Sequence, residues 1–373
     1  MTSVLIFSGF NMRAVYAFIR TLEKEKLTYA IIASSNEDEI FQTEYAKNVI
    51  AVREYKQLVL EDIVTSIQTV QQKTPSNKYF IAPSTEALNR FLLDNRKVLE
   101  DMNCIIPLTL QDLYEAISDK KSFGELCVKH HIPIPKEYDL NTVQIPCVAK
   151  PKTYVGEVSQ QILKPILIMT SEQLKGFYKK YNTKDFYFQE YVEGRSVYLL
   201  YYFYDDGSSL KYSQENFIQQ SEGRSILAAK SSDFHLSEHS KPYEKLFQGI
   251  TYRGLVMIEV KVDKNDALMI EANPRFWGPS QLFVDADVNF FNAMLYDYGL
   301  LSKKPMPKNN LAKSILYFWN DGESYLEENI EEVAFHNYSK KQFVEELELW
   351  EQSNILNRSD TKKIHQALIK GTD

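Results

Sequence analysis

The chain is poor in cysteine, in long apolar runs and in basic charge, and each absence excludes a class of protein. Among 373 residues there are only three cysteines, and the spacing of Cys104, Cys127 and Cys147 fits neither a disulfide framework nor a zinc site. No apolar run approaches the roughly 20 residues of a membrane span, and residues 1–7 lack the charged start of a signal peptide. The 43 Lys and Arg residues face 50 Asp and Glu residues, which argues against nucleic acid as a partner. We therefore expect a cytoplasmic protein that binds neither nucleic acid nor membrane.

The first third of the chain alternates short apolar strands with helical stretches. The expected strands are 4–7, 29–32, 49–52 and 79–82. Between them lie helix-like patterns such as 61–67, where apolar residues recur at helical spacing. This alternation predicts a parallel, doubly wound sheet. The turn at 8–11 lacks the repeated glycines of a dinucleotide-binding loop, which favours an ordinary strand-to-helix turn, whereas 83–86 follows a strand end and is a candidate substrate contact.

The stretch 257–280, MIEVKVDKNDALMIEANPRFWGPS, predicts a β-hairpin with its turn at 263–266. Its even-numbered residues are mostly apolar and should form the core face: Val256, Ile258, Val260, Val262, Leu268, Ile270 and Ala272. Glu259, Glu271 and Asn273 are odd-numbered, so they should share the opposite face.

Two carboxylates that face each other across a hairpin repel, and two interpretations remain. Either both point into water on a polar surface, or a divalent cation turns the repulsion into attraction. Arg275, Phe276, Trp277 and Gly278 follow, and a fixed arginine beside a metal site suggests a phosphate ligand.

Glu259, an eleven-residue gap and then Glu271-Ala272-Asn273-Pro274-Arg275 resemble the metal-binding signature of the ATP-grasp superfamily, in its carbamoyl-phosphate-synthase-like carboxylate–amine ligase branch. The resemblance implies an α/β chain with an ATP-grasp fold, α+β in its ATP-binding part, behind an N-terminal Rossmann-like domain. It also implies that Glu259, Glu271 and Asn273 hold Mg²⁺ or Mn²⁺, as two ions, on the phosphates of ATP. Arg275 would then be catalytic.

Two lysines match the family's phosphate contacts. Asp119, an expected N-cap, precedes Lys120 at the start of a helical stretch, and the turn Ile-Pro-Ile-Pro at 132–135 follows it. Lys150 stands about 30 residues later in a Lys-Pro pair, where a snorkelling surface lysine is the alternative. The resemblance assigns both lysines to ATP phosphates. The following loop departs from the family, because only Gly156 remains of its usual glycines.

The segment 186–194 predicts a buried strand that runs into a turn, and in the family this is the adenine hinge. The resemblance assigns nucleotide contacts to Gln189, Glu190, Tyr191 and Val192. The family's ribose-binding glutamate is replaced by Arg195-Ser196, and either Ser196 or Glu193 remains a candidate substitute. Arg224, before a later strand, is either a turn residue or a second catalytic arginine that meets the substrate carboxylate or the transferred phosphate.

The expected domains are a Rossmann-like domain at 1–106, a central subdomain with both lysines at 107–188, a metal-site subdomain at 189–325 and a helical extension at 326–373. In the extension, 339–342 resembles a capping box before a helix whose apolar residues are Phe343, Val344, Leu347 and Trp350. We expect this helix to pack on the protein or to serve in an oligomer such as a homodimer.

The resemblance implies an ATP- and Mg²⁺-dependent ligase that joins a small-molecule carboxylate to an amine through an acylphosphate and releases ADP and phosphate. No Met-Lys-Met stretch of a biotin carrier occurs. Two alternatives remain, an ATP-grasp kinase and a non-catalytic ATP-binding module. The missing ribose glutamate and the glycine-poor loop favour the module, and the full set of acids, amide and lysines favours catalysis.

Overall fold

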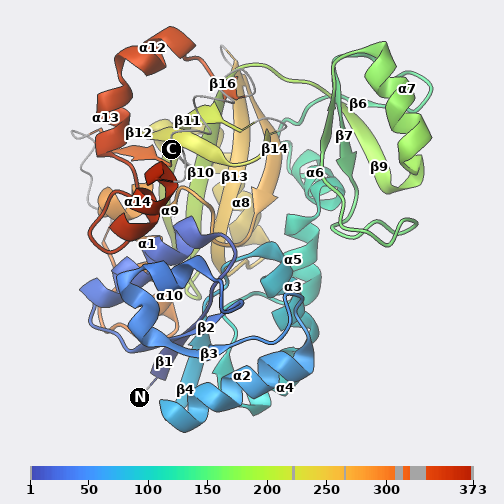
Figure 1. The fold of residues 1–373 in the computed structure, drawn as a ribbon. Helices are drawn as coiled ribbons and strands as arrows, with labels where there is room; N and C mark the ends of the chain where they lie inside the picture. The colour runs from blue at the N-terminus through green and yellow to red at the C-terminus, as the bar shows by residue number, and fades with distance from the viewer. Residues whose placement is uncertain (1, 221–222, 264–265, 307–313, 320–332, 371–373) are drawn as a thin grey trace.

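The computed structural model describes residues 2–220, 223–263, 266–306, 314–319 and 333–370, which build three sheets (Figure 1). The N-terminal sheet has the strand order β3-β2-β1-β4-β5, and every neighbouring pair in it is parallel. Its strands are β1 (Thr2–Phe7), β2 (Tyr29–Ala33), β3 (Val49–Val52), β4 (Lys78–Ile81) and β5 (Cys104–Ile105). Its helices are α1 (Met12–Lys24), α2 (Leu60–Lys73), α3 (Glu86–Asp94) and α4 (Arg96–Asp101). The predicted doubly wound sheet is confirmed.

A small antiparallel sheet stands apart from the rest as a separate lobe (Figure 1). Its order is β6-β9-β7-β8, with β6 (Glu137–Tyr138), β7 (Cys147–Pro151), β8 (Ile166–Ile168) and β9 (Phe186–Glu190). Helix α7 (Ser171–Lys180) begins with a capping box at Thr170 and buries Phe177 against Phe186 and Phe188. Helices α5 (Gln111–Ser118) and α6 (Lys120–Lys129) connect the N-terminal domain to this lobe. Strand β9 runs across the predicted domain boundary at 188/189, and the division into domains stays a proposal.

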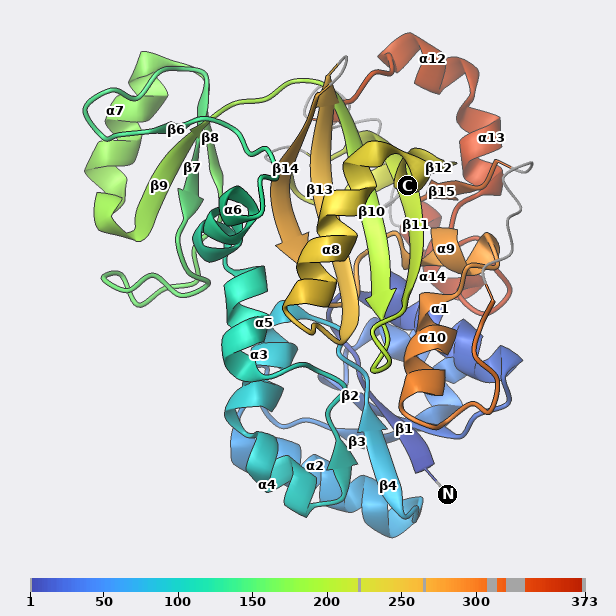
Figure 2. The ribbon, with the colours of Figure 1, turned by 180° about the vertical axis from the view of Figure 1, so that it is seen from behind.

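The large sheet has seven strands in the order β14-β13-β10-β11-β12-β15, with β16 paired to β11. They are β10 (Arg195–Phe203), β11 (Ser209–Gln219), β12 (Ile226–Ser232), β13 (Gly254–Asp263), β14 (Asp266–Asn273), β15 (Leu316–Phe318) and β16 (Ala334–Phe335). Helix α8 (Lys241–Gly249) covers one face (Figure 2). The other face packs on α1, α9 (Ser280–Asp285) and α10 (Phe290–Asp297). The face opposite α8 therefore looks toward the N-terminal domain.

The hairpin of β13 and β14 contains a β-bulge that alternation along the sequence does not reveal. Val256, Ile258, Val260 and Ala272 lie in the core under α8, as predicted. Leu268 and Ile270 do not, and the prediction for them is wrong. Glu259 pairs with Glu271, but Val260 pairs with Met269, so Ile270 is the extra residue and Met269 turns inward. Two of the predicted turn residues, 264 and 265, lie outside the described residues.

Within residues 333–370, which the structure describes, the C-terminal segment forms three short helices, α12 (Lys340–Glu345), α13 (Leu347–Gln352) and α14 (Lys362–Lys370). The predicted capping box forms between Ser339 and Gln342. Phe343 and Trp350 are buried, but the single predicted helix is wrong, because a break at Glu346 separates α12 from α13, and Val344 and Leu347 are exposed. None of the described helices has the length and apolarity needed to cross a bilayer.

Candidate functional site

The predicted metal-binding side chains come together at the edge of the large sheet. Glu259 on β13 lies directly opposite Glu271 on β14, and Met257 lies opposite Asn273. The Asn273 amide donates to Glu271 Oε1 at 2.8 Å. Glu259 is 7% exposed and the Glu271 side chain is 23% exposed, so the interpretation in which both glutamates point into water is wrong. The hairpin places two carboxylates and one amide in a site with little water.

The two carboxylates differ in electrostatic surroundings. Burial, and then the charge of Glu271, raises the pKa of Glu259. Burial also acts to raise the pKa of Glu271, but the Lys120 ammonium and the Asn273 amide outweigh it and hold that pKa well below its usual range. Lys120 Nζ lies 2.6 Å from Glu271 Oε2. One carboxylate is thus neutralised by a lysine, while its neighbour carries an electrostatic penalty that a cation would remove.

Ser196 supports Glu259 instead of facing the solvent. Its hydroxyl donates to Glu259 Oε1 at 3.2 Å and accepts from Asn216 Nδ2 at 3.0 Å, and Gln214 Nε2 donates to Asn216 Oδ1 at 2.8 Å. Ser196 is fully buried, so the predicted ribose contact does not fit its position. Asn216 and Gln214 were not predicted from the sequence, because their inward direction becomes visible only once β11 is placed beside β10.

Lys150 connects the small lobe to the hairpin. It projects from β7 and donates to the backbone carbonyl of Ile270 at 2.8 Å. Ile270 is the bulged residue, so the bulge presents the carbonyl that holds this lysine. Lys150 is 5% exposed, and burial together with the charge of Lys120 lowers its pKa to about 8, although the two glutamates act in the opposite direction. It is not a snorkelling surface residue.

Arg275 joins the cluster and Arg224 does not. Arg275 donates to Asn273 Oδ1 and to the Phe276 carbonyl, both at 3.0 Å, and its Nε lies 3.8 Å from Glu86 Oε2. Glu86 belongs to the predicted contact at 83–86, at the start of α3. Arg224 is exposed in the connection before β12, where its carbonyl accepts from Gln219.

The loop after Lys150 uses its own backbone groups internally. The Asp185 carboxylate accepts from the N–H groups of Val158 and Ser159 at 2.8 and 3.0 Å, and the Gly156 N–H donates to Gln161. A Cβ on Gly156 would lie 2.8 Å from Asp185 Oδ2, which explains a glycine at this position. In this conformation Gly156 does not offer its N–H to a phosphate. Asp119 does not cap α6 with its side chain as predicted, because its carboxylate accepts from Arg90 and from the Tyr154 N–H.

A cavity of about 500 Å³ lies beside the predicted hinge. Its lining consists of Tyr191, Val192, Glu193, Gly194, Arg195, Lys261, Val262, Asp263, Phe335, His336 and Asn337. Gln189 and Glu190 end β9 next to this cavity but do not line it. Lys261 Nζ lies 3.3 Å from His336 Nδ1, and His336 Nε2 lies 2.9 Å from Gln219 Oε1. Burial and then the charge of Lys261 lower the pKa of His336 to about 3, so it is neutral at pH 7. The contribution of residues 335–337 to this cavity was not predicted from the sequence.

The donor set suits a hard divalent cation. Two carboxylates and an amide oxygen are the ligands that Mg²⁺ accepts when phosphates complete its shell. Among the described residues no group of three or more His, Cys, Asp or Glu side chains could hold a metal ion.

The arrangement of a parallel N-terminal sheet, a small antiparallel lobe and a large antiparallel sheet is the ATP-grasp fold. No protein-family model and no curated protein matches the chain. Solved structures do. Biotin carboxylase from Campylobacter jejuni, in its βγ-ATP complex, has a TM-score of 0.60 at 15% identity, over 82% of this chain and 72% of that one.

Two further structures show the same fold. The biotin carboxylase domain dimer of Hydrogenobacter thermophilus 2-oxoglutarate carboxylase, with MgADP and bicarbonate, has a TM-score of 0.59 at 14% identity and covers 81% and 71% of the two chains. N5-carboxyaminoimidazole ribonucleotide synthetase from Thermus thermophilus has a TM-score of 0.60 at 13% identity and covers 88% and 97%. At these identities the likeness establishes the fold. The predicted fold class is confirmed.

Proposed function

We propose that the protein is an ATP- and Mg²⁺-dependent ligase that joins a carboxylate to an amine through an acylphosphate. The observation that carries this proposal is the convergence of Glu259, Glu271, Asn273, Lys120, Lys150 and Arg275 at one place. Lys150 comes from the small lobe, Lys120 comes from the start of α6, and the other four residues come from the hairpin of the large sheet and the segment directly after it.

In this proposal ATP lies between β7 and the hairpin, with adenosine toward the hinge cavity and the triphosphate toward Glu259 and Glu271. Lys150 contacts the α- and β-phosphates, and Lys120 contacts the terminal phosphates. Two Mg²⁺ or Mn²⁺ ions held by Glu259, Glu271 and Asn273 would compensate the negative charge of the phosphoryl group during its transfer. Tyr191, Val192 and Glu193 form the hinge wall, and Glu193 is the remaining candidate for the ribose contact, with Lys261 and His336 opposite.

The reaction proceeds in two displacements. A substrate carboxylate oxygen attacks the γ-phosphorus, the bond to the β,γ-bridging oxygen breaks, and ADP leaves. The amine lone pair then attacks the acyl carbon, the carbon–oxygen bond to phosphate breaks, and the amine gives up a proton to solvent. Arg275 stabilises charge on the transferred phosphoryl group, so the protein supplies position and charge and no nucleophile of its own.

A homodimer also remains a proposal.

The loop at 152–159 supports a second candidate, a non-catalytic ATP-binding module. Its N–H groups are bound by Asp185 and by the loop itself, so catalysis requires it to rearrange. An ATP-grasp kinase, which would stop after the first displacement, is the third candidate.

The test is product analysis with Mg·ATP, pooled carboxylates and pooled amines. We expect ADP and phosphate to form only when a carboxylate pool is present, and an amide to form when amines are added. A phosphorylated product that amines do not consume would identify a kinase. AMP would contradict the acylphosphate route. Binding of Mg·ATP without any product from the pools would favour the module.

A further inference from the structure

The N-terminal sheet reverses its strand order between β1 and β4. From β1 the chain winds outward through β2 and β3, and on the other side it continues from β4 to β5. Ligands of doubly wound sheets bind at the carboxyl ends of the strands at such a switch point. Here the Asn11 amide donates to the Ser84 carbonyl at 2.9 Å and to the Phe276 carbonyl at 3.2 Å. The switch point therefore meets the segment 275–278 that follows the candidate metal ligands.

Arg13, in the first turn of α1, lies at this meeting point. Its guanidinium lies over the Trp319 ring, 3.8 Å from the ring centroid, and a Cβ on Gly278 would be 2.8 Å from its Cζ. Its hydrogen-bond acceptors are all neutral: the Ile226 carbonyl at 3.1 Å, the Tyr317 hydroxyl at 3.4 Å and the Ser225 hydroxyl at 2.9 Å. Within the described part of the chain, no carboxylate forms an ion pair with it.

Three other arginines of this protein, in contrast, form ion pairs with carboxylates. Arg20 lies 2.7 Å from Asp360, Arg90 lies 2.6 Å from Asp119, and Arg253 lies 2.7 Å from Asp297. The Arg13 guanidinium packs against Trp319 and Gly278, and its acceptors among the described residues are neutral, so no nearby negative charge compensates its positive charge. An anionic ligand would provide that compensation.

Tyr198 lies in the same row of the large sheet as two of the candidate metal ligands. It stands beside Glu259 in the sheet, and Glu259 stands beside Glu271, so the three form one row. Tyr198 is 6% exposed. Burial and then the charges of Glu259 and Glu271 raise its pKa, while the Arg275 and Arg13 guanidinium groups both act to lower it. Both cations therefore lie within electrostatic reach of this side chain.

Two further buried groups at this junction lack partners among the described residues. They are the Ser84 hydroxyl, on a residue 1% exposed, and the Trp277 indole N–H, on a residue 2% exposed. Buried polar groups are nearly always hydrogen-bonded, and a bound ligand is one reason for exceptions. Asn11 contacts Ser84, and Trp277 directly precedes Gly278, which packs against the Arg13 guanidinium.

We propose that the switch-point edge around Arg13, Ser84, Tyr198 and Arg275 binds a carboxylate substrate with a second anionic group. Arg275 lies on the side of the metal ligands, where the reacting carboxylate belongs, and Arg13 holds the second anion, a carboxylate or a phosphate. This inference rests on the proposed function, because it places the reacting carboxylate beside the ATP phosphates.

The test is calorimetric titration of the full-length protein, with and without Mg·ADP, using probes that differ in their second charge. Glutarate and adipate carry a second carboxylate, 3-phosphoglycerate carries a phosphate, and butyrate and glycerate are matched compounds with one anionic group. We expect at least one two-anion class to bind ten-fold or more tightly than its one-anion match. Arg13→Gln should remove this preference, and Arg13→Lys, which keeps the charge, should retain part of it. The class that binds identifies the second anion.

Equal binding of two-anion and one-anion probes to the wild-type protein would overturn the inference, and so would failure of every probe to bind. Unchanged selectivity in a folded Arg13→Gln variant, checked by its thermal midpoint, would also overturn it. The comparison within the wild-type protein does not depend on the folding of any variant. Mg·ADP affinity, measured in the same samples, tests the proposed function separately, because the titrations without nucleotide test only the anion site.

Discussion

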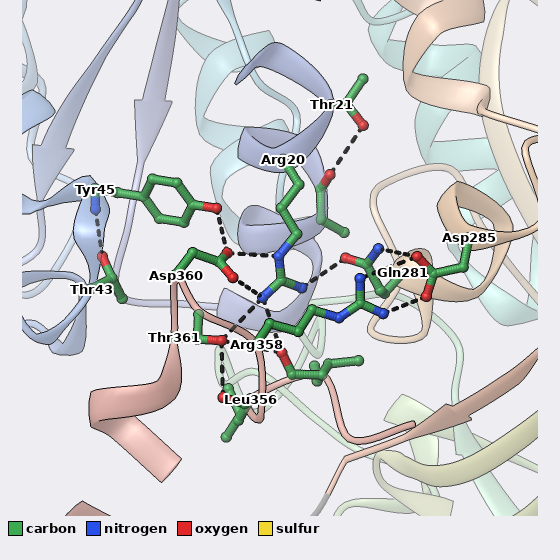
Figure 3. A network of polar contacts seen from close by, with 12 residues as sticks. Arg20, Thr21, Thr43, Tyr45, Gln281, Asp285, Leu356, Arg358, Asp360 and Thr361 are labelled. Carbon is green, nitrogen blue, oxygen red and sulfur yellow. Dashed lines mark hydrogen bonds and ion pairs between the residues drawn. The ribbon is translucent and has the colours of Figure 1, made fainter. Parts of the chain in front are cut away.

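Two largely buried charge clusters in this protein differ in how their charges are paired. In the first, Arg20 of α1 binds Asp360 bidentately at 2.7 and 3.2 Å and also binds Gln281, the Ile355 carbonyl and Thr361 (Figure 3). Tyr45 donates to the same Asp360 carboxylate. The second cluster places Glu259 against Glu271.

The difference separates charges that hold the fold from charges that, in our proposal, a bound ligand compensates. In the Arg20 cluster, burial acts to raise the pKa of Asp360, but Arg20 outweighs it and the pKa falls, so the charged form is favoured. In the hairpin cluster the pKa of Glu259 is raised, so its charge is not fully compensated. A folded chain tolerates such a deficit where a bound ligand corrects it, and the same reasoning distinguishes Arg13 from Arg20.

Glu271→Gln should give the largest effect on function. We expect turnover to fall on the order of 10³-fold, because the variant loses a charge that we propose binds the metal. Stability should change by less than about 1 kcal/mol, since the lost attraction to Lys120 is offset by lost repulsion from Glu259. Turnover and urea unfolding measure the two effects.

The matched control is Glu244→Gln, which neutralises a half-buried glutamate paired with Lys211 on the α8 face of the sheet. It should leave turnover within about two-fold of wild type. Wild-type turnover in Glu271→Gln would rule out the metal assignment.

Arg20→Ala should give the largest effect on stability. Removing the arginine leaves Asp360 buried without its cation, which costs about 3 kcal/mol or more in unfolding free energy. Arg358→Ala, at the more exposed Arg358–Asp285 pair of the same region, should cost less than about 1 kcal/mol. Mg·ATP affinity should be unchanged in both folded variants. Equal losses of stability would show that burial does not distinguish these two pairs.

A pH dependence of nucleotide binding should give the smallest effect. The pKa of Lys150 is lowered to about 8 in the free protein, and phosphate would favour the charged lysine and raise it. Above pH 8, binding must therefore take up a proton, and Mg·ATP affinity should fall by up to about ten-fold per pH unit. Below pH 8 the lysine is already charged and the profile should be flat.

Lys150→Arg keeps its charge throughout this range, so its profile should stay flat above pH 8. The sign for stability is opposite to the sign for binding. The folded protein releases the Lys150 proton more readily than the unfolded chain, so this residue's contribution to stability should rise between about pH 8 and its unfolded pKa. Parallel binding profiles for wild type and Lys150→Arg would contradict the phosphate contact.

The sequence predicted the fold and most members of the candidate site, because these depend on local patterns. The strands at 4–7, 29–32, 49–52 and 79–82 follow from apolar runs. Glu271 and Asn273 share a face because they stand at alternating positions of β14, and Glu259 shares it because it pairs with Glu271. The roles proposed for these residues stay predictions.

What the sequence could not reveal depends on contacts distant in the chain. The bulge at Ile270 depends on pairing with β13, and the burial of Ser196 depends on β11 and β13 on either side of it. Asp185 binds loop residues about 26 positions away, and Arg13 meets Ser225 and Tyr317 far along the sequence. No local periodicity encodes such contacts.

The bulge at Ile270 has a consequence for how this chain can vary over time. The acceptor that holds Lys150 is a main-chain carbonyl, which every amino acid possesses. Replacing the Ile270 side chain therefore does not remove the acceptor, whereas deleting one residue between Met269 and Glu271 does. Substitutions at position 270 should therefore be tolerated. Insertions and deletions in this short stretch should be selected against.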